Sequence, residues 1–229
     1  MGNTNYTSKK VGDITISVVD GNKFTITTNR LVLYSLNQIE EDSLIENYNH
    51  LLRDPKNVAL YGYGEPWSRE HVEKLIREQT LKWNSGERFC IFSVHDAASK
   101  NFIGSLTIKH AKNDFSTVGS GHENAAEIGY ILDKKFWGKG FGTEVAIIGK
   151  KYIKHLVAEA RNSHQDSPQE IVATVHPLNG GSKRILQKTL KNQEPDEFLK
   201  FGDLPRLLFF KPLKQINSLF EQPAALELK

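Results

Sequence analysis

Three glycines alternate with two larger residues near the middle of the chain, at Gly138, Gly140 and Gly142, with Lys139 and Phe141 between them. The stretch before them has the pattern of a strand, and a helix is predicted to begin near residue 142. Because glycine has no Cβ, the backbone can turn tightly and a bulky anion can approach its N–H groups. The first turn of a helix adds unpaired amides and the positive end of the helix dipole. A strand, a glycine turn and a helix N-terminus in this order predict a phosphate-binding site.

The spacing of the glycines excludes two common phosphate motifs. A Walker A loop has four residues between its first glycine and Gly-Lys-Ser/Thr, whereas Gly138-Lys139 is followed by Gly140. A dinucleotide fingerprint needs glycine at its sixth place, where this chain has Thr143, so a nucleotide-dependent oxidoreductase is disfavoured. A turn that only reverses the chain is the remaining structural alternative.

The run from Trp137 to Gly142 resembles the acetyl-CoA loop of the GNAT N-acetyltransferases, Arg/Gln-x-x-Gly-x-Gly/Ala, with Trp in the first place. This Trp, the Glu-Ile-Gly-Tyr before the loop and the Gly-Thr-Glu at its end are similar to the RimJ/RimL-like branch, which acetylates protein N-termini and related amines. The resemblance implies acetyl-CoA as the cofactor. The pyrophosphate would meet the amides of 138–143, and the pantetheine arm would pair with the backbone of a splayed strand. The expected cofactor-binding residues are Tyr130, Ile131, Leu132, Trp137, Gly138, Lys139, Gly140, Phe141, Gly142, Thr143, Asn179 and Ser182.

A second segment, Asn179-Gly-Gly-Ser182 followed by an amphipathic helix, is similar to the part of the GNAT fold that closes the cofactor cleft. By that resemblance Asn179 contacts the pantetheine arm, and Ser182 lies near the thioester sulfur. Ser182 could equally be the N-cap of this helix, and both roles can coexist.

Acetyl transfer to an amine needs a base, donors for the oxyanion and a proton for the departing thiolate. We expect Glu127 on the splayed strand to be the base, although its carboxylate could instead be an ion-pair partner. Glu65, Glu123 and His176 are the reserves. A backbone N–H near Tyr130 or Ile131 is the expected oxyanion donor.

The proton for the thiolate has no obvious source. The family often takes it from a tyrosine late in the chain, but the last tyrosine here is Tyr152. Ser182 or a water must substitute, or the thiolate leaves unassisted, so Ser182 is the second catalytic candidate. This gap keeps open a second hypothesis, a non-catalytic acyl-CoA-binding or interaction module on the same fold.

An aromatic, glycine-rich loop at 61–67 lies between two predicted helices, where GNAT proteins commonly cover the acceptor. Tyr61, Tyr63, Glu65 and Trp67 are therefore the predicted substrate residues, with an ordinary surface loop as the alternative. The predicted enzyme moves the acetyl group by direct attack in a ternary complex. The acceptor is expected to be a primary amine, either a protein N-terminal α-amine or a small-molecule amine.

Composition limits the other classes of function. With 229 residues, 38% of them hydrophobic, one domain with a sizeable core is expected. The 30 basic and 27 acidic residues are mixed along the chain, so no basic stripe for nucleic acid is seen, and no apolar run is long enough for a membrane span. The single cysteine, Cys90, excludes an intrachain disulfide and is expected to be buried. We expect a cytoplasmic monomer or homodimer without a metal.

The predicted fold class is α+β, a GNAT fold with a central, mostly antiparallel mixed sheet flanked by helices. An N-terminal tail (1–10) and a hairpin around a two-residue turn at Asp20-Gly21 form an extension over 1–28. The acetyltransferase domain follows over 29–211, and a C-terminal tail over 212–229. Helices are predicted near 38–53, 69–84, 142–158 and 182–190, and strands near 88–95, 101–110, 125–132, 171–175 and 207–210.

Overall fold

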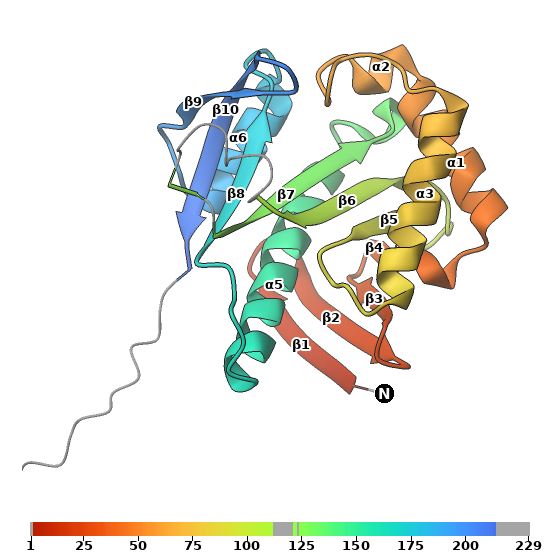
Figure 1. Cartoon of the computed structure of the whole chain (residues 1–229), viewed down its shortest axis with the longest axis vertical. Coiled ribbons are helices and arrows are strands. Elements are labelled where there is room, and N and C mark those ends of the chain that lie inside the picture. The colour runs from red at the N-terminus through yellow and green to blue at the C-terminus, as the bar shows by residue number, and fades with distance from the viewer. Residues whose placement is uncertain (1, 112–120, 123, 214–229) are drawn as a thin grey trace, which may run out of the picture.

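A ten-stranded sheet organises the computed structural model, which describes residues 2–111, 121–122 and 124–213. The strand order is β1-β2-β3-β4-β5-β6-β7-β8-β10-β9 (Figure 1). Neighbouring strands are antiparallel except β7 and β8, which are parallel, so the predicted mixed sheet is confirmed. The strands are β1 Gly2–Ser8, β2 Gly12–Val19, β3 Lys23–Thr27, β4 Leu31–Ser35, β5 Ile91–Asp96, β6 Phe102–His110, β7 Ala125–Leu132, β8 Glu170–Val175, β9 Asp196–Lys200 and β10 Leu204–Pro212.

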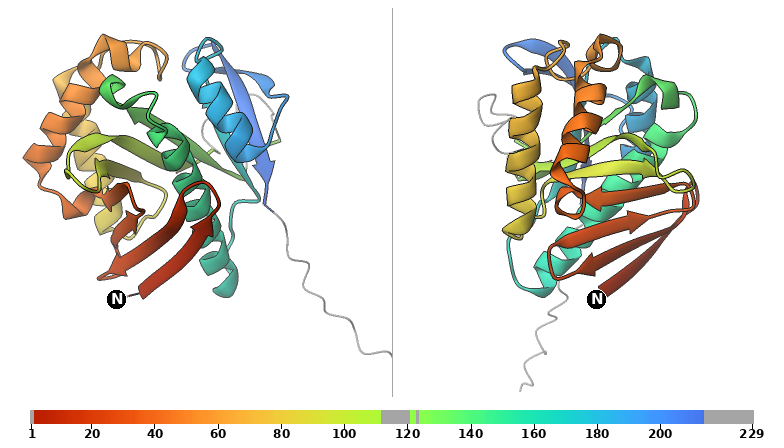
Figure 2. Two further views of the ribbon diagram at one scale, coloured as in Figure 1. Left: turned by 180° about the vertical axis from the view of Figure 1, so that it is seen from behind. Right: turned by 90° about the vertical axis from the view of Figure 1, so that its right-hand side faces the viewer.

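Helices cover both faces of this sheet. Helices α1 (Glu41–Arg53) and α3 (Arg69–Asn84) pack together on one face, and α5 (Phe141–Asn162) and α6 (Gly180–Leu190) lie on the other (Figures 1 and 2). Short helical turns occur at η1 (Leu36–Gln38), α2 (Pro55–Val58) and η2 (Lys134–Phe136).

Local signals in the sequence set the ends and the buried faces of these helices. Ser68 caps α3 by accepting from the His71 amide at 3.2 Å. Apolar side chains along one side of α5, which include Val145, Ile148 and Tyr152, are buried. Its period of about 3.6 residues places these side chains against the sheet.

The N-terminal extension differs from the prediction. Residues 1–10 were expected to be a loose tail, yet Gly2–Ser8 forms β1 and pairs with β2 from Gly2↔Val18 to Ser8↔Gly12. Its side chains are polar and partly exposed, so no apolar periodicity reveals the strand, and backbone pairing with β2 forms it instead. The turn between β2 and β3 has three residues rather than the predicted two, since Val19 pairs with Lys23.

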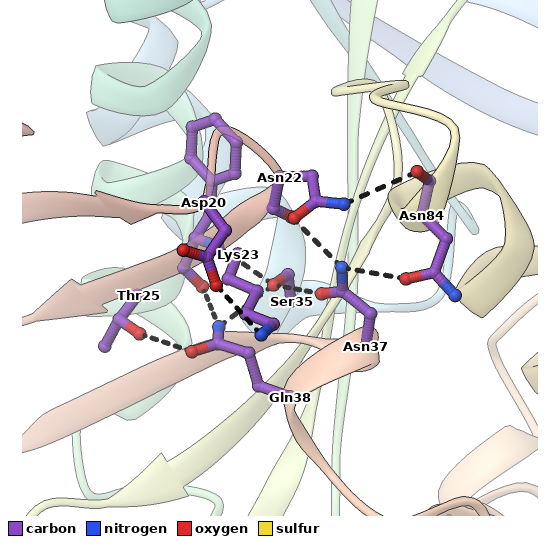
Figure 3. A network of polar contacts seen from close by, with 9 residues as sticks. Asp20, Asn22, Lys23, Thr25, Ser35, Asn37, Gln38 and Asn84 are labelled. Atoms are coloured by element: carbon purple, nitrogen blue, oxygen red, sulfur yellow. Dashed lines mark hydrogen bonds and ion pairs between the residues drawn. The ribbon is translucent and has the colours of Figure 1, made fainter. Parts of the chain in front are cut away.

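The extension is built into the core of the domain. Ile14, Ile16, Phe24 and Ile26 are buried and belong to the same apolar cluster as the helices. A polar network then fixes the β2–β3 turn to η1 and the end of α3 (Figure 3). In it, Asn37 Nδ2 donates to the Asn22 carbonyl and to Asn84 Oδ1, both at 3.2 Å.

The C-terminal edge of the sheet contains a strand that the sequence did not reveal. The sequence predicts no helix or strand within 191–205. The structure has β9 there, which pairs with β10 from Lys200↔Leu204 to Asp196↔Leu208. β10 is longer than the predicted 207–210. Of the predicted tail at 212–229, residues 214–229 lie outside the described part of the chain.

Candidate active site

The two parallel strands at the centre of the sheet separate soon after they begin. β7 and β8 pair from Ala125↔Glu170 to Glu127↔Val172, and within the described residues no pairing continues beyond this point. The strands then diverge, and α5 and α6 lie on one side of them (Figures 1 and 2). The predicted splay is therefore confirmed. A cavity of about 870 Å³ lies here. It is lined by the strands β5 to β10, by α1, α3, α6 and the start of α5, and by the loop before α3.

The glycine loop enters this cavity at the start of α5. Gly138 and Gly140 have φ of 73° and 83°, in the left-handed region that residues with a Cβ rarely adopt. Gly142 lies close to α6, because a Cβ there would be 3.0 Å from the Ile185 side chain. Helix geometry leaves the first amides of α5 without intrahelical partners. The residues present therefore fit a pyrophosphate group.

An ion pair between Arg30 and Glu144, which the sequence analysis missed, supports the glycine loop. Arg30 Nε and Nη2 donate to the Glu144 carboxylate at 2.8 and 2.5 Å, and Nη1 donates to the Lys139 carbonyl at 3.0 Å. Thr28 Oγ1 donates to the other Glu144 oxygen at 2.6 Å. Glu144 is buried in the first turn of α5, and the pairing with Arg30 offsets the charge that it would present to a phosphate. An acidic residue in the first turn of a helix was the available signal, but its partner is 114 positions away.

The cofactor residues predicted around the loop line the cavity with one exception. Trp137 is half-exposed, and its indole Nε1 donates to the Leu132 carbonyl at 2.8 Å, which closes the loop onto the end of β7. Lys139 does not line the cavity, and its Nζ lies 5.5 Å from the Phe136 ring centroid. Its contribution to the loop is its backbone carbonyl.

The second cofactor segment has a different cap from the one considered. Asn179 is the N-cap of α6, and its side chain accepts from the Ser182 amide at 3.0 Å. The alternative in which Ser182 is the cap is therefore wrong, because the helix begins two residues earlier than predicted. The Ser182 side chain is left facing the cavity, beside Tyr130.

Tyr130 carries a buried hydroxyl that has no hydrogen-bond partner among the described residues. Burial raises the pKa of this hydroxyl to about 12, and the neighbouring Ser182 side chain offsets part of that rise. The group is protonated at neutral pH and is available as a donor to a ligand in the cavity.

Glu127 is buried and held by three side chains. Lys200 Nζ lies 2.6 and 2.8 Å from its two oxygens, Thr174 Oγ1 donates at 3.0 Å, and Lys109 Nζ lies 3.3 Å away. This is the ion-pair arrangement that the sequence left open. The role of Glu127 as a base stays a prediction. Lys200 comes from β9, the unpredicted strand, so no sequence signal pointed to it.

The reserve bases are less suited. Glu65 is exposed and does not line the cavity, and Glu123 lies outside the described residues. His176 lines the cavity, but its Nδ1 already accepts from the Leu178 amide at 3.1 Å. Burial and the nearby Arg206 lower the pKa of His176. In the neutral ring the proton is then on Nε2, which leaves no free acceptor nitrogen for the proton of an amine.

The aromatic loop predicted to cover the acceptor reaches the same cavity. Tyr61, Tyr63 and Trp67 line it, whereas Glu65 does not. Burial raises the pKa of Tyr61, while the charge of Lys109 lowers it and that of Glu127 raises it further. Tyr63 is exposed and contacts the Phe201 ring, with 5.3 Å between the ring centroids.

Three further findings concern Cys90, membrane spans and metal ligands. Cys90 is buried, as expected, and burial raises the pKa of its thiol to about 12. Among the described residues, none of the helices combines the length and the apolar character that a membrane span needs. The same residues contain no group of three or more His, Cys, Asp or Glu side chains arranged to hold a metal ion.

Comparison with solved structures shows the same fold at low sequence identity. A GNAT-family acetyltransferase from Bacillus anthracis matches with a TM-score of 0.58 and 16% identity, covering 82% of this chain and 98% of that one. A ribosomal-protein-S5-alanine acetyltransferase from Vibrio fischeri matches with a TM-score of 0.55 and 15% identity, covering 82% and 96%. RimL, a ribosomal L7/L12 α-N-protein acetyltransferase solved with coenzyme A, matches with a TM-score of 0.53 and 15% identity, covering 81% and 95%.

The sequence itself matches the family model described as the acetyltransferase (GNAT) domain over residues 30–189. This match begins at Arg30, which bonds to the glycine loop, and ends in α6, so it includes both cofactor segments. The predicted resemblance and the predicted cofactor are confirmed. The chain belongs to the GNAT family of acetyltransferases, which use acetyl-CoA.

Proposed function

We propose that this protein transfers the acetyl group of acetyl-CoA to a primary amine, with an N-terminal α-amine as the first choice and a small-molecule amine as the second. One observation carries the proposal: a single cavity joins the glycine loop on one side of the sheet to the Glu127–Lys200 pair on the other, through the gap between β7 and β8. A thioester and an amine that enter from opposite sides could meet there for direct attack in a ternary complex. Two of the similar structures are named for acetylation of ribosomal proteins, which supports the α-amine.

In this proposal the cofactor occupies the α5–α6 side. The pyrophosphate binds the amides of 138–143, and the pantetheine arm follows the open edge of β7 toward Ser182. The Leu132 carbonyl already accepts from Trp137, so we expect Tyr130 and Ile131 to contribute more of the backbone pairing. A backbone N–H in this stretch then donates to the oxyanion.

The charges around Glu127 favour an acceptor that loses its proton easily. Lys109 and Lys200 disfavour an ammonium nearby, and this lowers the pKa of a bound amine. An α-amine starts near pKa 8 and a lysine near 10.4, so the α-amine reaches its neutral form at physiological pH with less help. Such an amine needs only a modest base, so we expect Glu127 to accept its proton directly or through a water.

We assign assistance to the departing thiolate to the Tyr130 hydroxyl together with Ser182. The hydroxyl is buried beside Ser182 and has no partner among the described residues. Because its pKa is about 12, full proton transfer to a thiolate is uphill, and a hydrogen bond to the developing charge is the expected contribution.

An acceptor screen that follows release of free CoA tests the proposal. Peptides with free N-termini, the same peptides N-acetylated, polyamines and aminoglycosides form the panel. Release that needs a free α-amine is the expected result. A protein that binds CoA by calorimetry and turns over none of these acceptors would instead be a non-catalytic acyl-CoA-binding module. The ion-paired state of Glu127 is the observation that favours this second candidate.

A further inference from the structure

The cavity carries a local excess of positive charge. Six lysine and arginine side chains line it, and among the described lining residues Glu127 is the single carboxylate. The whole chain is nearly balanced, with 30 basic and 27 acidic residues, so the excess does not follow from composition. The six cations are Lys82, Lys109, Arg184, Lys188, Lys200 and Arg206.

Of these six cations Lys200 and Arg206 are buried, and of those two, among the described residues, only Lys200 is paired with a carboxylate. Arg206 is 4% exposed, and it donates to the Pro205 carbonyl at 3.0 Å and to the Gly62 carbonyl. Its guanidinium lies 5.2 Å from the Phe201 ring centroid. Within the described residues no carboxylate forms an ion pair with it, and burial lowers its pKa. A buried cation held only by carbonyl oxygens and a ring is a site where an anionic ligand is stabilising.

The phosphates of CoA are not suited to be this anion. Leu207 and Phe209 of β10 pack into the core cluster that includes Leu186 and Leu190 of α6. Side chains alternate along a strand, so Arg206 points to the opposite face of the sheet. There, Leu208 packs with Val172 and Phe198 in a separate cluster. The glycine loop and α6 belong to the other face, and Arg206 instead contacts the loop before α3 through Gly62.

Arg206 is close to the proposed reaction centre. Lys200 Nζ lies 5.3 Å from the same Phe201 centroid and binds Glu127 at 2.6 Å. The buried guanidinium and the Glu127–Lys200 pair therefore lie next to the same ring. A short acceptor could reach both groups at once.

We propose that the acceptor is an amine with a carboxylate a few bonds from its nitrogen, and that Arg206 binds this carboxylate while the amine faces Glu127. The inference rests on the proposed function, since it specifies the acceptor of the same site. The carboxylate could be an acidic side chain at the first or second position of a peptide, or the α-carboxylate of a free amino acid. In either case it offsets the charge of Arg206 and makes two parallel hydrogen bonds with the guanidinium.

Matched acceptor pairs test the inference. The pairs are Asp-Ala-Ala amide with Asn-Ala-Ala amide, Ser-Asp-Ala amide with Ser-Asn-Ala amide, and free alanine with alaninamide. The first two represent an acidic peptide and the third a free amino acid. We expect kcat/KM for one acidic member to exceed that of its neutral partner at least 10-fold, because one charge-assisted pair is lost. Equal kcat/KM within all three pairs would overturn the inference.

Variants of Arg206 test whether this residue causes the preference for acidic acceptors. Arg206→Met should reduce the acidic-to-neutral ratio to about 2-fold or less and leave CoA affinity within about 2-fold. Arg206→Lys keeps the charge and should retain part of the ratio, so a folding defect in the Met variant does not decide the outcome. Arg184→Met is the matched control on the cofactor side, where CoA affinity should fall and the ratio should persist. An equal loss for both acceptors in Arg206→Met and Arg206→Lys would contradict the assignment.

A binding measurement separates this inference from the proposed function. If no acceptor releases CoA, the proposed function fails, and calorimetry with N-acetyl-Asp-Ala-Ala amide, N-acetyl-Asn-Ala-Ala amide, N-acetylalanine and N-acetylalaninamide, each added to the CoA complex, still tests the anion site. Tighter binding of an acidic ligand that is lost in Arg206→Met would support it. Equal binding of the acidic and neutral ligands would overturn it.

Discussion

The two halves of the cavity are built in different ways. The cofactor half is one short stretch of backbone, Trp137 to Thr143, with the start of α6 packed against it, and its key properties are positive φ angles and open amides. The acceptor half is assembled from side chains of β6, β7, β8, β9 and β10 and the loop before α3. A backbone site depends on glycines and tolerates changes elsewhere, whereas a side-chain site depends on ion pairs between distant segments. Substitutions should therefore affect the two halves by different routes.

The largest effect is expected at Glu127. Glu127→Gln leaves Lys200 buried beside a neutral amide, and breaking a buried ion pair in this way costs about 3–5 kcal/mol of unfolding free energy. Denaturant unfolding should show this loss, and turnover should fall more than CoA affinity.

A double variant then divides structure from chemistry. Glu127→Gln combined with Lys200→Met removes both charges, so much of the stability should return. If turnover stays low, Glu127 acts in the reaction. Recovery of turnover together with stability would show that its contribution is structural only.

A smaller effect is expected in the cofactor half. Gly140→Val places a β-branched residue at φ of 83°, with its Cβ about 3.5 Å from Arg30 Nη2, at a strain of about 1–3 kcal/mol. Calorimetry should show CoA affinity reduced at least 10-fold. Gly21→Val is the matched control, because Gly21 also has positive φ, at 76°, but lies in the β2–β3 turn. Gly21→Val should lose stability and keep CoA affinity. A similar loss of CoA affinity in Gly21→Val and Gly140→Val would contradict the difference between the two halves of the cavity.

Tyr130 lies at the boundary of the two halves. Tyr130→Phe removes a buried hydroxyl that has no partner among the described residues, so the melting temperature should stay the same or rise. Turnover should fall about 10-fold if the hydroxyl assists the thiolate, which corresponds to about 1.4 kcal/mol. A variant that is stable and fully active would return this role to Ser182 or water.

The smallest effect is expected at His95 in β5, a strand of the sheet that carries both halves of the cavity. Burial lowers the pKa of His95, whose ring nitrogens contact Ser93 Oγ and the Lys100 carbonyl at 2.8 and 3.1 Å. The unfolded chain therefore binds a proton at a higher pH than the folded one, and stability falls as pH drops below about 6.5. One such group changes the unfolding free energy by at most about 1.4 kcal/mol per pH unit.

Unfolding curves from pH 7.5 to 5.5 measure this slope. His95→Gln should flatten it without changing CoA affinity at pH 7.5. An unchanged slope would mean that other groups, such as His155, whose pKa burial also lowers, set the pH dependence.

The sequence by itself determined the parts of this protein that obey local rules. Alternating glycines before a helix and the apolar period of α5 depend on neighbours within a few residues, so the cofactor loop and most elements of the fold could be predicted, although the N-cap of α6 is Asn179 and not Ser182. β1 and β9 could not, because polar strands form by pairing with a neighbour and carry no periodicity of their own. Only the tertiary structure brought Lys200 to Glu127, Arg30 to Glu144 and Arg206 to Gly62, across separations of 73, 114 and 144 residues. The physical reason is that an ion pair or a buried guanidinium is specified by proximity in space, which the register of distant strands decides.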